Sequence, residues 1–275
     1  MELNAVKEEE ISVLLNDLLE CYGYDFTDYS LASMQRRINR LFSMDRFPSF
    51  AEFRYRVRND PSYIQHFVEE ITVNVTEMFR DPSFYLALRK QVLPMLATYP
   101  FIRIWHAGCS TGEEVYSMAI LLQEANLLHK SVIYATDINT SVLEKARKGI
   151  FPIANMQQYS QNYMASGGQH EFSAYYAAKY DYAKFNESLS RKVIFAPHNL
   201  VTDGSFNEFQ LIICRNVLIY FNKDLQEKVL RLFSESLEQL GYLGLGAKET
   251  LKFTNDAHKF RQIDKREKIW RKVSI

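Results

Sequence analysis

The sequence contains few cysteines, no long apolar run and no net charge, and each absence excludes a class of protein. Its three cysteines are an odd number without paired spacing, which disfavours a disulfide framework and favours a reducing cytosol. No apolar run approaches the ~18 residues of a membrane-spanning helix. The formal net charge is zero, which argues against a general nucleic-acid binder.

Two further absences concern targeting and metal binding. Met1 is followed by Glu2 and an acidic amphipathic segment, where a secretory leader would carry a basic stretch and then an apolar one. We therefore expect a cytoplasmic protein that does not insert into membranes. The six histidines lie without ligand spacing, and the sequence predicts no metal site.

What is present is a chain of 275 residues, 47% of them hydrophobic, which is enough for one full domain and a smaller one. Up to about residue 72 the apolar residues follow helical spacing, and an all-α domain is expected. Two apolar stripes carry this prediction: Ile11, Leu14, Leu15, Leu18 and Leu19, then Leu31, Met34, Ile38, Leu41 and Phe42. Ser49 with Glu52 predicts the start of a third helix, which Asp60-Pro61 ends before a fourth.

Strands and helices then alternate, a pattern typical of a parallel sheet covered by helices. Strands are predicted at 101–106, 131–136, 193–196, 210–214 and 242–247, with an antiparallel hairpin in the tail. Helices are predicted from Asp81-Pro82 to near Pro94, at 113–126, from a Ser141/Glu144 capping box to Gly149, and at 223–239. The expected fold class is α/β, with a doubly wound, mostly parallel, Rossmann-like sheet, a small N-terminal all-α domain and an inserted subdomain.

We expect three parts: a helical domain over 1–72, a linker and connecting helix over 73–94, and an α/β domain over 95–275. Residues 151–192 interrupt the alternation inside the last part. Gly167-Gly168 predicts a turn there, and the Tyr- and Ala-rich piece 175–185 fits a helix or a strand equally. An insertion of this size at the rim of an open sheet is commonly a lid or a docking element.

The most informative segment is 102–114. A β-branched run leads into a small-residue turn, which opens a helix whose first residues are Glu113 and Glu114. A strand, a glycine turn and a helix in this order form a nucleotide-binding crevice, where the helix N-terminus usually holds phosphate. The two carboxylates would repel a pyrophosphate and attract a cationic ligand such as S-adenosylmethionine, and the G-x-G-x-x-G spacing of dinucleotide sites is missing. Alternatively, the acidic first turn only complements the helix dipole.

Two strand ends beyond this turn carry further candidates. Asp137 ends the second strand, where a carboxylate accepts both ribose hydroxyls of a nucleoside in such a crevice, although an Asp there is also a common helix-entry residue. The fourth strand ends in the segment 214–221, Cys-Arg-Asn-Val-Leu-Ile-Tyr-Phe. Methyltransferases acting on nitrogen often carry Asn-Pro-Pro-Tyr at this place. Its absence disfavours a nitrogen acceptor.

Together these segments resemble the CheR family, the chemotaxis-receptor glutamate O-methyltransferases, over most of the chain. The resemblance rests on the order and spacing of five segments: 74–80, 107–114, 135–139, 198–200 and 214–221. It implies a methyltransferase domain over 95–275 that uses S-adenosylmethionine, with S-adenosylhomocysteine as product and no metal. The implied acceptors are glutamate side chains of a methyl-accepting chemoreceptor or a similar helical signalling protein.

Carried over to the matching positions, the resemblance implies cofactor contacts from residues in all five segments: Asn74, Thr76, Arg80, Glu114, Asp137, Asn199, Leu200, Arg215 and Asn216. Glu114 is implied to meet the positively charged amino-acid end of the cofactor, and Asp137 its ribose. Asn199 and Leu200 are implied to flank the adenine.

The family also implies that Arg80 and Tyr220 lie beside the transferred methyl group. A glutamate side chain, with an ordinary pKa near ~4.3, is ionised at neutral pH and needs no general base to act as a nucleophile. Arg80 would orient that carboxylate by a two-pronged hydrogen bond, and Tyr220 would pack beside it. Alternatively, Arg80 only holds the interdomain linker and Tyr220 is a core residue.

A docking surface is predicted on the helix around residues 31–44. There Arg36, Arg37 and Arg40 are expected to project opposite the apolar stripe, as a basic face for an acidic helical receptor segment. Its attraction would mainly raise the association rate and would weaken with salt. The plainer alternative is an ordinary solvated face.

Two segments depart from the family pattern. The insertion is longer and richer in Tyr and Ala than the small β-subdomain by which some members tether a receptor peptide, which puts tethering in doubt. Gly246-Ala247-Lys248-Glu249 stands where many members have Gly-His-Ser-Glu, and we expect Lys248 and Glu249 to form an ordinary turn pair. Two rival functions stay open: a catalytically quiet, cofactor-binding signalling scaffold, and a methyltransferase for a small molecule or RNA.

Overall fold

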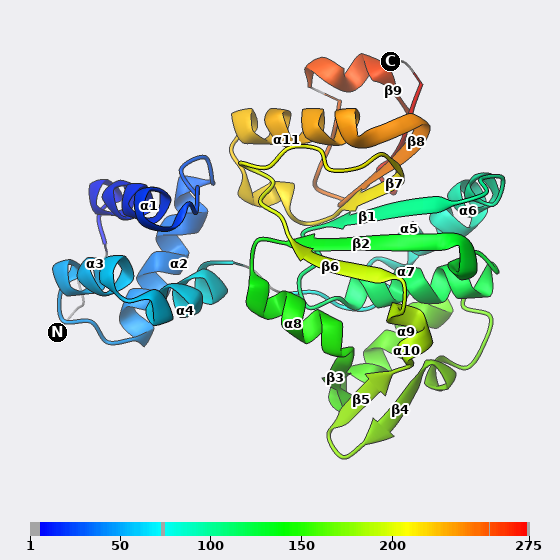
Figure 1. The fold of residues 1–275 in the computed structure, drawn as a ribbon, viewed down its shortest axis with the longest axis horizontal. Helices are drawn as coiled ribbons and strands as arrows, with labels where there is room; N and C mark the ends of the chain where they lie inside the picture. The colour runs from blue at the N-terminus through cyan, green and yellow to red at the C-terminus, as the bar shows by residue number, and fades with distance from the viewer. Residues whose placement is uncertain (1–5, 73–74, 253, 274–275) are drawn as a thin grey trace. The chain divides into compact units, whose positions relative to one another are not determined.

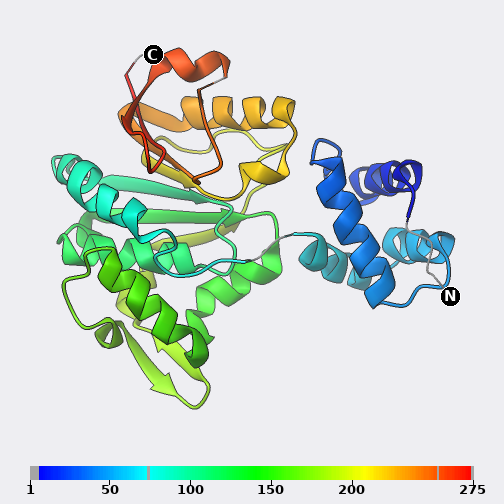
Figure 2. The same cartoon turned by 180° about the vertical axis from the view of Figure 1, so that it is seen from behind.

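The computed structural model describes residues 6–72, 75–252 and 254–273. The chain divides into two compact units, Met1–Asn74 with Leu218–Val229, and Val75–Val217 with Leu230–Ile275. Figures 1 and 2 show the elements of both units from two sides. Each unit is described here by itself.

The first unit is all-helical, as the apolar spacing predicts. It contains α1 (Glu8–Tyr22), α2 (Leu31–Met44), α3 (Phe50–Asn59) and α4 (Pro61–Ile71). The Ser49 side chain caps α3 by accepting a hydrogen bond from the Glu52 backbone, and Asp60 caps α4 in the same way. The buried carboxylate of Asp17 joins α1 to α3, because it binds the partly exposed Arg54 and Arg58. Hydrogen bonding from Arg54 lowers the pKa of Asp17.

The second unit is built on a seven-stranded sheet of order β6-β2-β1-β7-β8-β10-β9. Its strands are β1 (Ile102–Ala107), β2 (Ser131–Asp137), β6 (Val193–Pro197), β7 (Phe209–Cys214), β8 (Leu237–Leu245), β9 (Phe260–Asp264) and β10 (Ile269–Lys272). The first five run parallel, whereas β10 and β9 form the antiparallel hairpin predicted for the tail. The predicted doubly wound, mostly parallel fold is confirmed.

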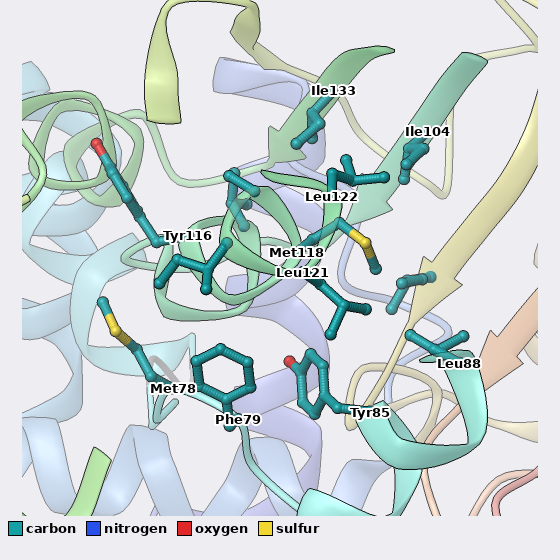
Figure 3. Packing of buried hydrophobic residues seen from close by; sticks show 14 of the residues in the cluster. Met78, Phe79, Tyr85, Leu88, Ile104, Tyr116, Met118, Leu121, Leu122 and Ile133 are labelled. Carbon is teal, nitrogen blue, oxygen red and sulfur yellow. The ribbon is translucent and has the colours of Figure 1, made fainter. Parts of the chain in front are cut away.

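Helices cover both faces of this sheet (Figure 1). α7 (Glu113–Glu124) and α8 (Thr140–Lys148) lie on one face, and the later part of α11 (Lys223–Ser236) lies on the other. Figure 3 shows Met118, Leu121 and Leu122 of α7 packed between the strand residues Ile104 and Ile133 and the aromatic rings of residues 79 and 85. This packing fixes the start of α7 against the ends of the strands, where the candidate site lies.

Three predicted boundaries differ from the structure. The helix expected to end near Pro94 continues as α5 (Pro82–Ala87), a π-helical turn (Leu88–Val92) and α6 (Leu93–Leu96), and the π-turn accommodates the missing N–H of the proline. The cap of α8 is Asn139 and not the predicted Ser141 box. α11 ends at Ser236, and the chain enters β8 directly.

The insertion folds into a helix and a small sheet. It contains β3 (Ile150–Pro152), α9 (Met156–Ala165), β4 (Tyr176–Lys179), β5 (Tyr182–Phe185) and α10 (Glu187–Ser190), with an antiparallel sheet of order β3-β5-β4. Residues 175–185, whose composition fitted a helix or a strand equally, therefore mainly form the hairpin of β4 and β5. The buried Glu124 of α7 anchors the insertion, because its carboxylate accepts hydrogen bonds from the Tyr175 hydroxyl (2.9 Å) and the Gln169 backbone (3.1 Å) and pairs with Arg89.

Candidate functional site

The turn after β1 is folded onto the end of β2. The backbone N–H groups of Gly108 and Cys109 both donate to the carbonyl of Thr136, at 2.8 and 2.9 Å. Gly108 has φ +76°, and a Cβ there would stand 2.5 Å from a methyl group of Val217. Ser110 is also left-handed, at φ +50°. The turn therefore requires glycine at residue 108 and brings the backbone close to β2 and to the loop after β7.

Asp137 lies at the centre of this arrangement. Its side chain is buried, with 9% of the residue exposed, and its oxygens accept hydrogen bonds from the backbones of Ser110 and Asn139, both at 2.9 Å. Burial raises the pKa of this carboxyl, and the backbone hydrogen bonds partly oppose that. Each oxygen keeps a lone pair for a further donor. The turn N–H groups of 108–110 are thus already bonded within the protein and form no open phosphate cradle.

Glu114, in the first turn of α7, forms a charged network with two other buried side chains. Its carboxylate accepts from His106 Nδ1 at 3.0 Å and from Arg215 Nη1 at 3.2 Å. Burial by itself would raise the pKa of Glu114, but its contacts with His106 and Arg215 outweigh it and hold the pKa below its ordinary value. Glu114 is therefore an ionised carboxylate that is already matched by a guanidinium.

Arg215 links this network to the segment around Arg80. Its Nη2 binds the Asp81 carboxylate at 2.6 Å, its Nη1 donates to the Arg80 carbonyl at 3.1 Å, and its guanidinium stacks 4.2 Å from the centre of the Phe84 ring. Arg80 itself is half-buried and donates to the Val75 carbonyl. It lies between two left-handed residues, at positions 79 and 81. Such strained backbone is typical of functional sites.

The loop after β7 is held by a residue that the sequence analysis assigned to a plain turn. Glu249, only 4% exposed, accepts hydrogen bonds from the backbones of Asn216 (3.1 Å), Val217 (2.9 Å) and Gly246 (2.6 Å). The predicted turn is present, because the Glu249 backbone donates to the Gly246 carbonyl at 2.9 Å. The carboxylate does more than a turn requires, since it also organises the loop that carries Asn216. Asn216 has φ +61°, which this clamp stabilises.

The segment that follows β6 is hydrogen-bonded to Asp137. The His198 backbone donates to the Asp137 carbonyl at 3.2 Å, and the next two residues are Asn199 and Leu200. The Asn199 side chain caps its own turn by accepting from Val201, and Leu200 is 9% exposed. The second unit thus contains Arg80, Glu114, Asp137, Asn199, Leu200, Arg215 and Asn216, which come from five segments of the chain.

Glu113 does not share the environment of Glu114, contrary to the expectation of two carboxylates in one crevice. It is 6% exposed and accepts a hydrogen bond from the Thr111 hydroxyl at 2.6 Å. Burial raises its pKa from 4.5 to about 7. The prediction that this crevice repels phosphate therefore cannot rest on a pair of adjacent charges, and it depends on Glu114, Asp137 and the bonded N–H groups of the turn.

Glu113→Gln is expected to stabilise the protein at pH 8. Because the folded-state pKa of about 7 lies above the ordinary 4.5, the stability linked to this proton is present below pH 4.5 and is lost as the pH rises through 7. A neutral amide does not ionise and so avoids this loss, which is on the order of 3 kcal/mol at most, and it still accepts from Thr111. Urea unfolding of both proteins at pH 5 and pH 8 measures this difference. An equal free-energy difference between them at both pH values would contradict it.

The remaining predicted residues fall in different places. Thr76 is half-buried, and Asn74 lies outside the described residues. Arg36 and Arg40 are exposed on α2, where Arg40 pairs with Glu70 at 3.4 Å. The placement of Arg37 beside them on the solvent face is wrong. Arg37 is buried, because it follows Met34 by three residues and so shares the apolar side of α2.

Tyr220 belongs to the first unit and is half-buried. Its ring lies under the guanidinium of Arg37, with Arg37 Cζ 4.5 Å from the ring centre. Its ring therefore contacts Arg37, a residue that the sequence assigned to docking.

Sequence reasoning missed three residues that build the site: His106, Asp81 and Glu249. His106 carried a signal, because it stands at the carboxyl end of β1, one residue from the glycine turn. Asp81 was assigned only to starting a helix. Glu249 occupies the position of the Glu in the family motif Gly-His-Ser-Glu, which was the available signal. Among the described residues no cluster of three or more His, Cys, Asp or Glu could hold a metal ion, and no helix there is long and apolar enough to cross a membrane.

Comparison with known proteins identifies the chain. A mostly parallel sheet with a carboxylate at the end of β2 is typical of nucleotide-binding α/β proteins. "CheR methyltransferase, SAM binding domain" matches residues 74–269, and "CheR methyltransferase, all-alpha domain" matches residues 9–72. The chain belongs to the CheR methyltransferase family.

Curated relatives agree with this membership. Cher3 of Pseudomonas putida, a protein named as a methyltransferase, is 46% identical over 263 residues, which are 96% of this chain and 96% of the relative. A chemotaxis protein methyltransferase of Listeria monocytogenes is 32% identical over 83% of this chain and 85% of its own length. One of Borreliella burgdorferi is 30% identical over 90% of each chain.

Proposed function

We propose that this chain transfers a methyl group from S-adenosylmethionine to glutamate side chains of a chemoreceptor or a related helical signalling protein. Membership of the family makes it an S-adenosylmethionine-dependent methyltransferase of chemotaxis. The observation that carries the choice of cofactor is the pairing of a buried carboxylate, Asp137, with a glycine turn whose N–H groups are already bonded. The choice of acceptor rests on the chemotaxis methyltransferases among the relatives. We further propose that the protein works in the cytoplasm.

The residues of the second unit fit this cofactor. The free lone pairs of Asp137 suit two ribose hydroxyls, and the buried charges of Glu114 and Arg215 suit the ammonium and carboxylate of an amino-acid end. Asn199 and Leu200 are proposed to flank the adenine, and Thr76, Asn74, Arg80 and Asn216 to complete the contacts. When bound, S-adenosylmethionine supplies a methyl group on a sulfonium centre. A phosphate-bearing ligand would find two ionisable carboxylates and no open cradle.

Methyl transfer to a glutamate carboxylate requires little proton transfer by the protein. A glutamate carboxylate is ionised at neutral pH, so the protein must bind, orient and desolvate it. Good positioning alone contributes ~7–11 kcal/mol to such reactions. We propose that Arg80 orients the carboxylate and that Tyr220 packs and hydrogen-bonds beside it. The exposed Arg36 and Arg40 of α2 are proposed to attract an acidic helical segment of the acceptor.

Incubation with methyl-labelled S-adenosylmethionine and chemoreceptor-containing membranes tests this proposal. Label that enters receptor protein and leaves as methanol in mild alkali is expected, because carboxyl methyl esters are base-labile. Excess S-adenosylhomocysteine should abolish the transfer. Label in RNA or in a small molecule would contradict the acceptor, and cofactor binding without any transfer would indicate a signalling scaffold.

A further inference from the structure

Arg37 of α2 is a buried cation without an acidic partner. Only 7% of the residue is exposed, its Nη1 donates to the Ile71 carbonyl at 2.6 Å, and no carboxylate pairs with it among the described residues. Its Nη2 is buried and has no hydrogen-bond partner in the described part of the chain. Burial lowers its pKa. One hydrogen bond to a carbonyl does not account for a buried guanidinium, which is costly to desolvate.

The other contact of Arg37 is the Tyr220 ring. The guanidinium carbon lies 4.5 Å from the ring centre, and this attraction is strongest for a desolvated cation. The planar guanidinium suits a ring face better than a lysine ammonium does. Arg37 therefore contacts Tyr220 by a cation–π interaction, for which arginine is better suited than lysine.

The backbone of the Tyr220 segment is fixed to the same unit. The Ser30 backbone donates to the Tyr220 carbonyl at 2.8 Å, Tyr29 and Phe221 form an isolated antiparallel bridge, and their rings meet edge to face at 4.9 Å. The Asn222 backbone donates to the Asp28 carbonyl at 2.9 Å. The loop before α2 thus sets the path of the segment, and Arg37 sets the direction of the ring.

We propose that Arg37 is a positioning residue for methyl transfer, which acts by holding the Tyr220 ring in place. This inference rests on the role proposed above for Tyr220. It makes α2 part of the catalytic machinery and not only a docking surface. The exposed side of that helix carries Arg36 and Arg40, while its buried side holds Tyr220.

Arg37→Met tests the proposal because it keeps much of the apolar volume and removes the cation. The turnover rate on receptor membranes is expected to fall about ten- to hundred-fold, as for a misplaced catalytic group. The receptor KM and the affinity for S-adenosylhomocysteine should change little. Arg37→Lys keeps the charge and should recover part of the rate. Arg54→Met is the matched control, because it removes an arginine that pairs with the buried Asp17 in the same helical unit.

A double variant with Arg37→Met and Tyr220→Phe distinguishes an effect of Arg37 on the position of Tyr220 from an effect on the stability of the protein. If Arg37 acts through the Tyr220 hydroxyl, Arg37→Met should cost little more rate once that hydroxyl is gone. The proposal would be overturned if the rate loss of the double variant equalled the product of the two single losses. It would also be overturned if Arg37→Met kept the unaltered rate, or if Arg54→Met lost as much rate as Arg37→Met. If Arg37→Met does not fold, the same cycle with Arg37→Lys decides.

The two proposals fail in different ways. Full activity of Tyr220→Phe would contradict the role of Tyr220 given under the proposed function. An impaired Tyr220→Phe together with a fully active Arg37→Met would contradict only the positioning role of Arg37. No methyl ester formation by the unaltered protein would contradict the proposed function itself.

Discussion

Asp137→Ala is expected to weaken S-adenosylhomocysteine binding about 100-fold. We propose that this carboxylate accepts two ribose hydroxyls, and each hydrogen bond to a charged group contributes about 1.5 kcal/mol or more, where about 1.4 kcal/mol is tenfold in affinity. Asp137→Asn keeps one acceptor oxygen and should lose about tenfold. Calorimetric titration with S-adenosylhomocysteine measures both changes.

Asp256→Ala serves as the control for this pair. Asp256 is another partly buried carboxylate of the second unit, but it pairs with Lys259 (2.9 Å) and contacts none of the candidate residues. Its replacement should leave the affinity within about twofold, since surface changes away from the site have small effects. Wild-type affinity in a folded Asp137→Ala protein would refute the ribose assignment.

Glu249→Ala is expected to destabilise the protein by about 3 kcal/mol or more and to reduce cofactor affinity as well. The substitution leaves the backbone donors of Asn216, Val217 and Gly246 without their acceptor, and each unmet buried donor costs about 1–3 kcal/mol. Glu249→Gln should also be harmful, because its amide NH2 must face one of these N–H groups. Urea unfolding and the binding titration measure the two effects.

The neighbouring Lys248 provides the control. It is exposed, and Lys248→Ala should change the unfolding free energy by no more than about 0.5 kcal/mol. A Glu249→Ala protein that is as stable as Lys248→Ala would show that the loop after β7 does not depend on the carboxylate.

Local features of the chain were predictable from the sequence. The helices of the first unit follow from apolar spacing alone, because each buries one side in a neighbour. The strands β1, β2 and β7 follow from β-branched runs, and Asp137 from its place at a strand end. The family resemblance then supplied most of the residues proposed to contact the cofactor.

Features that depend on distant contacts were not predictable. Glu249 lies 33 residues from Asn216, so its clamp has no local pattern. The hairpin β4–β5 is fixed by pairing with β3 and by the anchor on Glu124, and not by its own Tyr- and Ala-rich residues. Arg37 is different, because its spacing from Met34 already indicated the buried side of α2. Its charge led to the wrong assignment.

The central claim is that the crevice at the ends of β1 and β2 holds an adenosine with a charged amino-acid end and rejects phosphates. Side-by-side calorimetry of the purified protein with S-adenosylhomocysteine, ATP and NAD tests it most directly. The account predicts heat of binding for S-adenosylhomocysteine, lost in Asp137→Ala, and none for the two phosphorylated ligands. Tighter binding of ATP or NAD than of S-adenosylhomocysteine would contradict it.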